Sequence, residues 1–381
     1  MIFTIQPWIA FFLMCPLFLF AQTFDTGFTN LSLTDTSRNN RTVDVQVFYP
    51  AAIGGGGQDV AVAINNTPLV VLGHGFFMGI NAYSNIVDSL TPLGYAVALV
   101  DTETGLSPSH TDFGDDIAFT VDAVQTLGGI FIGKFGPKAA VMGHSMGGGA
   151  SFLVAESASV DCMVTIAPAE TTPSSIAAAA GITKPVLIFA GEDDCVAGIT
   201  DHQQPMYDAL NSSCKTMITV LGGSHCKFAE SNVACSTGEV FCSGSLSRAD
   251  QQAVVHDFLV PYLDFHLRSD ATAIAQFHNL LNTDTRTTSQ TTCLVSSNET
   301  ILKEINVAVH PNPAYNQITV ETDIAIQTIE IIDFQGRIIQ QQNNLDTPNV
   351  IQLNLSNISN GLYLLRLTTE NGLVSKKIVK Q

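Results

Sequence analysis

Hydrophobic residues in the first two thirds of the chain gather in short runs, and these runs predict the strands of a parallel sheet. A strand that is buried on both faces is apolar along its length, whereas a strand with one solvent-exposed face alternates apolar and polar residues. The segment TVDVQVFY alternates, and the later runs are continuous. The predicted strands are 42–49, 68–72, 95–100, 139–142, 185–190 and 216–221.

Helical spacing of apolar residues appears between and after these runs. Residues 112–127 have this spacing, with Asp115 and Asp116 in the first turns, where the helix dipole favours acidic side chains. Residues 251–267 predict a long amphipathic helix near the end of the domain. Strands that alternate with helices are typical of the α/β class, with helices on both faces of a mostly parallel sheet. We predict such a domain over residues 22–285.

The pattern changes after residue 304 to short alternating segments, separated by turns rich in Pro, Asn and Gly. These segments predict a small all-β sandwich over residues 305–381. The stretch before it is rich in Thr, Ser and Asn and has few apolar side chains to bury, so we predict a linker at 286–304. The predicted strands of the sandwich are 305–309, 317–321, 328–332, 350–355, 363–368 and 373–379.

The first residues predict a signal peptide at 1–21. The apolar run 8–21 is short for a membrane span and ends at the small residue Ala21, although no Lys or Arg precedes it. No later run is long and apolar enough to predict a membrane helix, so we expect no stable membrane insertion. The net charge of −18 argues against nucleic acid and anionic lipid as partners, because an acidic surface repels both.

The cysteine pattern fits an exported protein. Cys15 would leave with the signal peptide, and the later cysteines contain no CxxC pair, which argues against a zinc ribbon or a thioredoxin-like site. Disulfides persist in the oxidising compartment that an exported protein meets. We predict the local bridges Cys195–Cys214 and Cys235–Cys242. The number of remaining cysteines is odd, so at least one thiol should stay free or pair elsewhere.

The motif Gly143-His144-Ser145-Met146-Gly147 matches G-x-S-x-G and follows a predicted strand. A sharp strand-to-helix turn of this kind lifts a serine hydroxyl above the sheet, and glycines are needed where a side chain would collide with the neighbouring strand or helix. We predict Ser145 as a nucleophile; an ordinary glycine-rich turn is the alternative. A serine hydroxyl is a weak nucleophile at neutral pH and needs a base.

The residues that could complete such a site follow two later strands. In this kind of fold the order along the chain is Ser, acid, His. Glu192, Asp193 and Asp194 share one loop and are all candidates for the acid. His225 follows GGS at the end of a strand, where it can reach over the sheet edge. We expect the other later histidines to be surface or packing residues: His202, His256, His266 and His278.

The elbow GHSMGGG, the acid loop GEDDCVA and the histidine loop GGSH resemble the polyester-hydrolase, cutinase-like and dienelactone-hydrolase-like branch of the α/β-hydrolases. The first strand, from NNR to YPA, is similar as well. The likeness covers about residues 24–267. It implies Asp194 as the acid, with Asp193 as the fallback. The loop HGF matches the oxyanion loop of the family, which implies that the backbone N–H groups of Phe76 and Met146 hold the developing oxyanion.

The resemblance implies a serine carboxylic-ester hydrolase that works through an acyl-enzyme on small esters or polyesters, with PET-like polymers among them. This mechanism needs no metal and no organic cofactor. Polyester-cleaving members carry an aromatic residue directly after Ala-Pro, where this chain has Ala169. Phe76 and Phe77 either supply a stacking wall from the other side or belong to the core. A dienelactone- or chlorophyllase-type hydrolase and a catalytically silent adhesin are the alternatives. We expect Phe76, Phe77 and Ala169 to contact substrate.

Four motifs near the C-terminus, in the order HPNP, IIDFQGR, ISNGLY and KK, resemble the sorting domain that the type IX secretion system recognises. His310 stands where that family usually has an aromatic residue. The resemblance implies export by the general pathway, outer-membrane translocation by the type IX machinery and removal of the module. The expected localisation is therefore secreted or cell-surface. A carbohydrate-binding or adhesive β-module is the alternative.

Overall fold

The computed structural model describes residues 23–61, 65–240, 244–293, 307–322, 326–333, 338–345, 349–369 and 372–381. The predicted signal peptide lies outside these residues. The chain divides into two compact units, and the division falls between Leu294 and Val295. Each unit has its own hydrophobic core and is described by itself.

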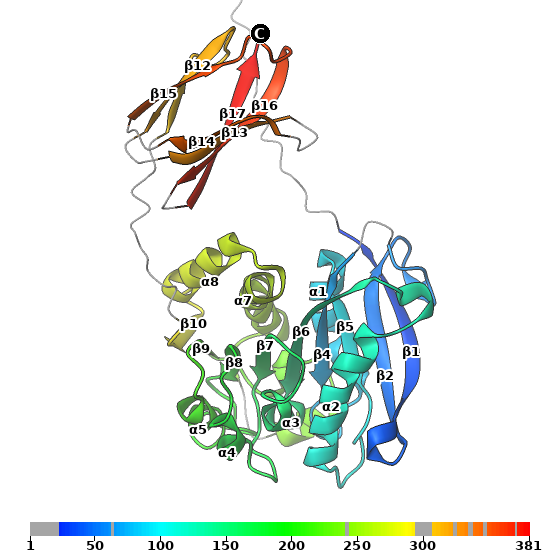
Figure 1. Cartoon of the computed structure of the whole chain (residues 1–381). Coiled ribbons are helices and arrows are strands. Elements are labelled where there is room, and N and C mark those ends of the chain that lie inside the picture. Colours follow the sequence, from blue (N-terminus) through cyan, green and yellow to red (C-terminus); the bar gives the residue numbers. More distant parts are fainter. Residues whose placement is uncertain are drawn as a thin grey trace, which may run out of the picture. The chain divides into compact units, whose positions relative to one another are not determined.

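The first unit is built on a ten-stranded sheet (Figure 1). The central strands pair parallel to one another, and so do β1 and the short β3. The pairs β1–β2, β2–β5 and β9–β10 are antiparallel. This arrangement confirms the predicted α/β class with a mostly parallel sheet. In spatial order the strands are β10 (Thr287–Thr291), β9 (Lys215–Val220), β8 (Val186–Gly191), β7 (Cys162–Ile166), β6 (Phe135–His144), β4 (Thr67–Gly73), β5 (Ala96–Val100), β2 (Arg41–Ala51), β1 (Asp25–Asp35) and β3 (Gly55–Gly56).

Helices cover both faces of this sheet. The α-helices are α1 (Ser84–Leu90), α2 (His110–Gln125), α3 (Met146–Val154), α4 (Ser175–Ala179), α5 (Gln203–Ala209), α6 (Val233–Gly238), α7 (Arg248–Arg268) and α8 (Ala271–Thr283). The 3-10 helices are η1 (Thr36–Arg38), η2 (Ile80–Tyr83), η3 (Thr91–Leu93), η4 (Gly129–Phe131) and η5 (Cys226–Phe228). Within the described ranges, none of the helices combines the length and the apolar character that a membrane crossing requires.

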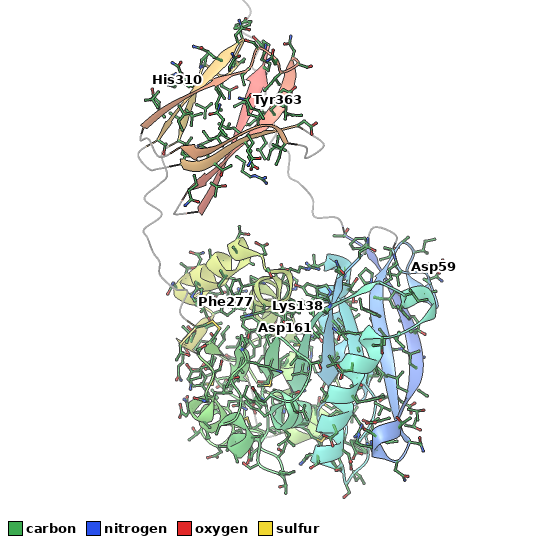
Figure 2. All side chains as sticks on the ribbon, viewed as in Figure 1. Asp59, Lys138, Asp161, Phe277, His310 and Tyr363 are labelled. Carbon is green, nitrogen blue, oxygen red and sulfur yellow. A yellow bond between two sulfur atoms is a disulfide. The ribbon has the colours of Figure 1, made fainter. Side chains whose placement is uncertain are left out.

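The alternation of side chains along β4 shows how the two faces are filled. Leu69 and Val71 belong to a core cluster that includes residues of α2 and α3, whereas Val70 and Leu72 belong to a second cluster with residues of α1, α7 and α8. Successive side chains of a strand point to opposite faces, so a strand buried on both faces is apolar throughout. Phe277 of α8 is fully buried in the second cluster (Figure 2).

The predicted linker at 286–304 was wrong in its first part. Residues Thr287–Thr291 form β10, which pairs antiparallel with Thr216–Val220 and extends the sheet by one strand. The strand has Thr, Ser and Gln side chains that are mostly exposed, and an edge strand of this kind needs only backbone hydrogen bonds from its neighbour. The first unit therefore continues beyond residue 285.

A disulfide between Cys214 and Cys293 joins the start of β9 to the chain just after β10. The predicted bridge Cys195–Cys214 is therefore wrong, although Cys195 is itself disulfide-bonded. The two bonded cysteines are 79 residues apart in sequence, and only the pairing of β9 with β10 brings them together. Spacing along the chain does not determine disulfide connectivity.

The predicted bridge Cys235–Cys242 is also wrong, because Cys235 is bonded to Cys226. Cys242 lies outside the described residues. Cys162 in β7 is a buried free thiol, which confirms that one cysteine stays unpaired. Burial raises the pKa of this thiol, so it stays protonated at neutral pH. Nearby, Lys138 of β6 forms an ion pair with Asp161, just before β7 (Figure 2).

The second unit consists of two antiparallel sheets, which confirms the predicted all-β sandwich. Both sheets supply residues to one core, including Ile318 and Val320 from the first sheet and Ile329 and Leu365 from the second. The polar strand β14 was not predicted. The three-stranded sheet holds β11 (Ala308–His310), β12 (Gln317–Thr322) and β15 (Asn349–Asn354). The four-stranded sheet holds β14 (Ile338–Leu345), β13 (Ile326–Ile332), β16 (Gly361–Thr369) and β17 (Gly372–Lys380).

Candidate active site

Ser145 occupies the turn between β6 and α3. Its backbone has φ 54° and ψ −118°, a conformation that residues other than glycine rarely adopt. A residue is held in such a conformation only when its surroundings enforce it, and such residues cluster at functional sites. The structure thus has the sharp strand-to-helix turn that the sequence motif predicts.

The glycines of the motif allow the turn to pack against the sheet. A Cβ on Gly143 would lie 2.2 Å from the carbonyl oxygen of Gly147, and a Cβ on Gly147 would lie 2.2 Å from the carbonyl oxygen of Gly73 in β4. The Gly147 N–H donates to the His74 carbonyl at 3.0 Å. The steric reason for glycine at both positions is therefore confirmed.

Asp194 lies in the loop after β8 and contacts His225 directly. Its Oδ2 is 2.7 Å from His225 Nδ1, and its Oδ1 accepts the N–H groups of Val196 at 2.9 Å and Ala197 at 2.8 Å. The Asp194 carboxylate is fully buried and the imidazole is 2% exposed. Because a carboxylate only accepts hydrogen bonds, His225 carries its proton on Nδ1, which leaves a lone pair on Nε2.

The other two acidic residues of this loop have different contacts. The Asp193 side chain is exposed, and its backbone N–H donates to the Gly223 carbonyl at 2.8 Å. Glu192 accepts the Gly222 N–H on Oε2 at 2.9 Å. Both residues thus fasten the acid loop to the histidine loop. Of the three candidates, it is Asp194 that pairs with His225.

The histidine loop is held from the side by α7. Gln251 is fully buried, accepts the Ser224 N–H at 3.0 Å and donates to the Ser224 carbonyl at 2.7 Å. Arg248 donates to the Cys226 carbonyl at 2.6 Å, and the disulfide to Cys235 follows His225 by one residue. Gln251 was not among the site residues predicted from the sequence. The only available signal was a polar residue on the apolar side of a predicted helix.

The predicted oxyanion loop lies against the elbow. A Cβ on Gly75 would lie 3.4 Å from Cβ of Ser145. Phe76 and Phe77 follow, with 48% and 49% of their surfaces exposed and ring centroids 6.3 Å apart, so they are not core residues. Met146 is the first residue of α3, where a backbone N–H has no intrahelical partner.

Of the remaining predicted residues, Ala169 lies beside the elbow, whereas His266 lies in the last turn of α7. Ala169 is half-buried and its N–H donates to the Ser145 carbonyl at 2.9 Å. His202 accepts the Glu170 N–H at 2.9 Å, and burial lowers the pKa of His266 to about 4; both fit the predicted packing roles. In the part of the chain that the structure describes, no group of three His, Cys, Asp or Glu side chains could hold a metal ion.

Comparison with known proteins settles the family. A family model described as PET hydrolase-like matches residues 26–261, which is more than half of the chain. The chain belongs to the PET hydrolase-like family. This hydrolase also carries a second match, to a secretion system C-terminal sorting domain at residues 308–381. A search of curated proteins gives no match.

The two matches make the protein a secreted PET hydrolase-like hydrolase, destined for the cell surface or the exterior. The first match begins in β1 and ends in α7, so it contains the elbow, the acid loop and the histidine loop. The second match covers every strand of the sandwich. The predicted family resemblance is confirmed for both units.

Proposed function

We propose that this PET hydrolase-like protein is a serine carboxylic-ester hydrolase that works through an acyl-enzyme. Ser145 is the nucleophile, His225 the general base and Asp194 the residue that orients the imidazole. The observation that carries the proposal is the buried 2.7 Å contact between Asp194 Oδ2 and His225 Nδ1. The histidine loop also contacts the segment of the strained elbow, because His144 Nε2 lies 3.2 Å from the His225 carbonyl. A carboxylate in this place fixes the tautomer in which Nε2 can accept a proton.

The reaction proceeds in two steps. The Ser145 oxygen attacks the ester carbonyl carbon while His225 Nε2 takes the hydroxyl proton. The carbon–oxygen bond to the alcohol breaks as His225 returns that proton to the leaving oxygen, which gives an acyl-enzyme. Water, activated by His225 in the same way, then releases the acid and restores Ser145. Asp194 stabilises the imidazolium that forms in each step.

The backbone N–H groups of Phe76 and Met146 receive the negative charge that develops on the carbonyl oxygen. The position of Met146 at the start of α3 supports its part, because the first N–H groups of a helix lack intrahelical partners. The contact of Gly75 with the elbow supports the part of Phe76, which follows it. Each such donor typically contributes about 3 kcal/mol to transition-state stabilisation.

Exposed apolar side chains on the loops around the elbow favour an apolar ester or polyester as the substrate. These loops follow the carboxyl ends of β4, β5, β8 and β9, the sheet edge at which Ser145 also lies. Substrates of open α/β sheets bind at this edge. The exposed residues are Phe76, Phe77, Leu106, Val196 and, at the start of α6, Val233. Ala169, beside the elbow, offers no aromatic ring, so the pair Phe76 and Phe77 is the proposed contact surface for substrate.

Labelling with a fluorophosphonate probe tests the proposal. The wild-type protein should be labelled, whereas Ser145→Ala should lose the label and lower kcat on nitrophenyl esters by about a millionfold, to the background rate. Ser157→Ala, at an exposed position after α3, is the control and should keep both. Unchanged labelling of Ser145→Ala would show that another residue reacts. Rates over esters of rising chain length and on a polyester film then define the substrate class.

A further inference from the structure

A second histidine lies inside the candidate active site. His144, the residue before the elbow serine, is 1% exposed, and its ring centroid is 4.9 Å from that of His225. Its Nε2 lies 3.2 Å from the backbone carbonyl of His225, and its Nδ1 lies 3.0 Å from the hydroxyl of Tyr83. This side chain has no part in the proposed acyl transfer.

The contacts continue from Tyr83 to the oxyanion loop. Tyr83, in η2, is 1% exposed, and its hydroxyl oxygen accepts the Gly75 N–H at 2.7 Å. Gly75 directly precedes Phe76. A continuous row of hydrogen bonds therefore leads from the backbone of the oxyanion loop, through Tyr83 and His144, to the backbone of the proposed base.

The chemistry of the groups determines the direction of each hydrogen bond. A carbonyl oxygen only accepts, so His144 Nε2 carries the proton and donates to His225. Burial, and then the charge on His225, lower the pKa of His144 well below its usual value, so its ring is neutral and Nδ1 accepts. The Tyr83 hydroxyl then donates to Nδ1 at 3.0 Å rather than to Met78 Sδ, a weaker acceptor at 3.6 Å, while its oxygen accepts from Gly75. Every buried polar atom in the row is satisfied in this one arrangement.

We propose that Tyr83 and His144 are positioning residues that tie the oxyanion loop to the loop of the catalytic base. The catalytic effect of these residues rests on the proposed function, whereas their hydrogen bonds do not depend on it. The row holds the backbone on both sides of the reacting carbonyl, so the oxyanion donor next to Gly75 and the imidazole of His225 keep one relative position. Its effect should appear in the transition state more than in substrate binding.

The neutral charge of the His144 ring should also favour the transition state. His225 becomes an imidazolium in each step, and a second cation with its ring centroid 4.9 Å away would oppose that charge. The donated Tyr83 hydrogen bond occupies the lone pair on which His144 would otherwise be protonated. Tyr83 therefore keeps His144, the neighbour of the base, uncharged throughout the reaction.

Removal of one hydroxyl tests the positioning role. Tyr83→Phe should lower kcat about tenfold and leave KM within about twofold, because two buried partners lose a hydrogen bond while the substrate contacts remain. Tyr95→Phe is the matched control, since Tyr95 is also fully buried and its hydroxyl donates to Asp264 at 2.6 Å. The control should keep kcat even if it unfolds at a lower temperature. Equal effects of the two variants on kcat would overturn the proposal.

Variants of His144 test the hydrogen bond that this side chain donates to the His225 carbonyl. His144→Gln can place an amide N–H near the His225 carbonyl and should retain more of kcat than His144→Leu, which lacks any donor. If His144→Leu has the kcat of the wild-type protein, the positioning role is refuted.

Nitrogen-15 NMR of the histidine rings tests the arrangement without any turnover. At pH 7 the full-length protein should show His144 as the neutral Nε2–H tautomer, and the Ser145→Ala variant should show the same. An Nδ1–H tautomer or a charged ring would overturn the proposal. Failure of the proposed function would instead appear as a wild-type protein that the fluorophosphonate does not label, with the tautomer unchanged.

Discussion

The elbow that presents Ser145 and the loop that presents His225 are held in place by different means. The elbow depends on the absence of side chains, because Gly143 and Gly147 let the backbone approach α3 and β4 to distances that no Cβ tolerates. The histidine loop depends on polar side chains from distant segments, with Gln251 and His144 satisfying its backbone groups. Crowding should therefore break the first element, whereas the loss of a hydrogen-bond partner should break the second.

The acid loop provides the sharpest test, because the residue that contacts His225 has an acidic neighbour that does not. Asp194→Asn should lower kcat by about 10,000-fold, since the amide no longer holds the tautomer that leaves Nε2 free. Steady-state rates on a nitrophenyl ester, with circular dichroism to check folding, measure this effect. Asp193→Asn is the matched control, because that side chain is exposed, and it should lower kcat by less than about twofold. A larger loss with Asp193→Asn than with Asp194→Asn would reverse the proposed assignment.

A larger residue in the serine elbow tests whether crowding breaks this turn. Gly147→Ala should lower kcat/KM about 100-fold, because the new Cβ would lie 2.2 Å from the Gly73 carbonyl and must displace Ser145. The same overpacking should also reduce the free energy of unfolding by roughly 1–3 kcal/mol, measured in urea. Gly105→Ala is the control, since no atom lies within 4 Å of a Cβ built there. Equal activity of the two variants would mean that the elbow yields to crowding.

Loss of a buried hydrogen-bond partner tests how the histidine loop is held, and it should have the smallest effect on activity. Gln251→Met keeps the length of the side chain but leaves the Ser224 N–H and carbonyl unpaired, so kcat should fall about tenfold. The control Gln204→Met removes a half-buried amide that contacts Asp208 on α5 and Gln290 on β10, away from the histidine loop, and its kcat should match the wild-type value. If Gln251→Met lowers stability but leaves kcat unchanged, Gln251 only supports the fold.

Much of this protein could be predicted from local patterns. Each predicted strand of the first unit is present within a few residues, and the elbow motif identifies the strained Ser145, because a sharp turn needs its glycines within one short segment. The alternating segments near the C-terminus likewise predict the sandwich, since each strand there buries one face. The pairing of Asp194 with His225 was predicted only through a family resemblance, as three acids share that loop.

By itself, then, the sequence determined the class of fold in each unit, the positions of most strands and the elbow, because these features depend on side-chain periodicity and on neighbours a few residues away. Only the tertiary structure decided that β10 belongs to the sheet, that Cys214 is bonded to Cys293, and that Gln251 and Tyr83 face the candidate site. Each of these depends on a contact between segments that the sheet order brings together, and no local pattern of hydrophobic and polar residues encodes which segments become neighbours.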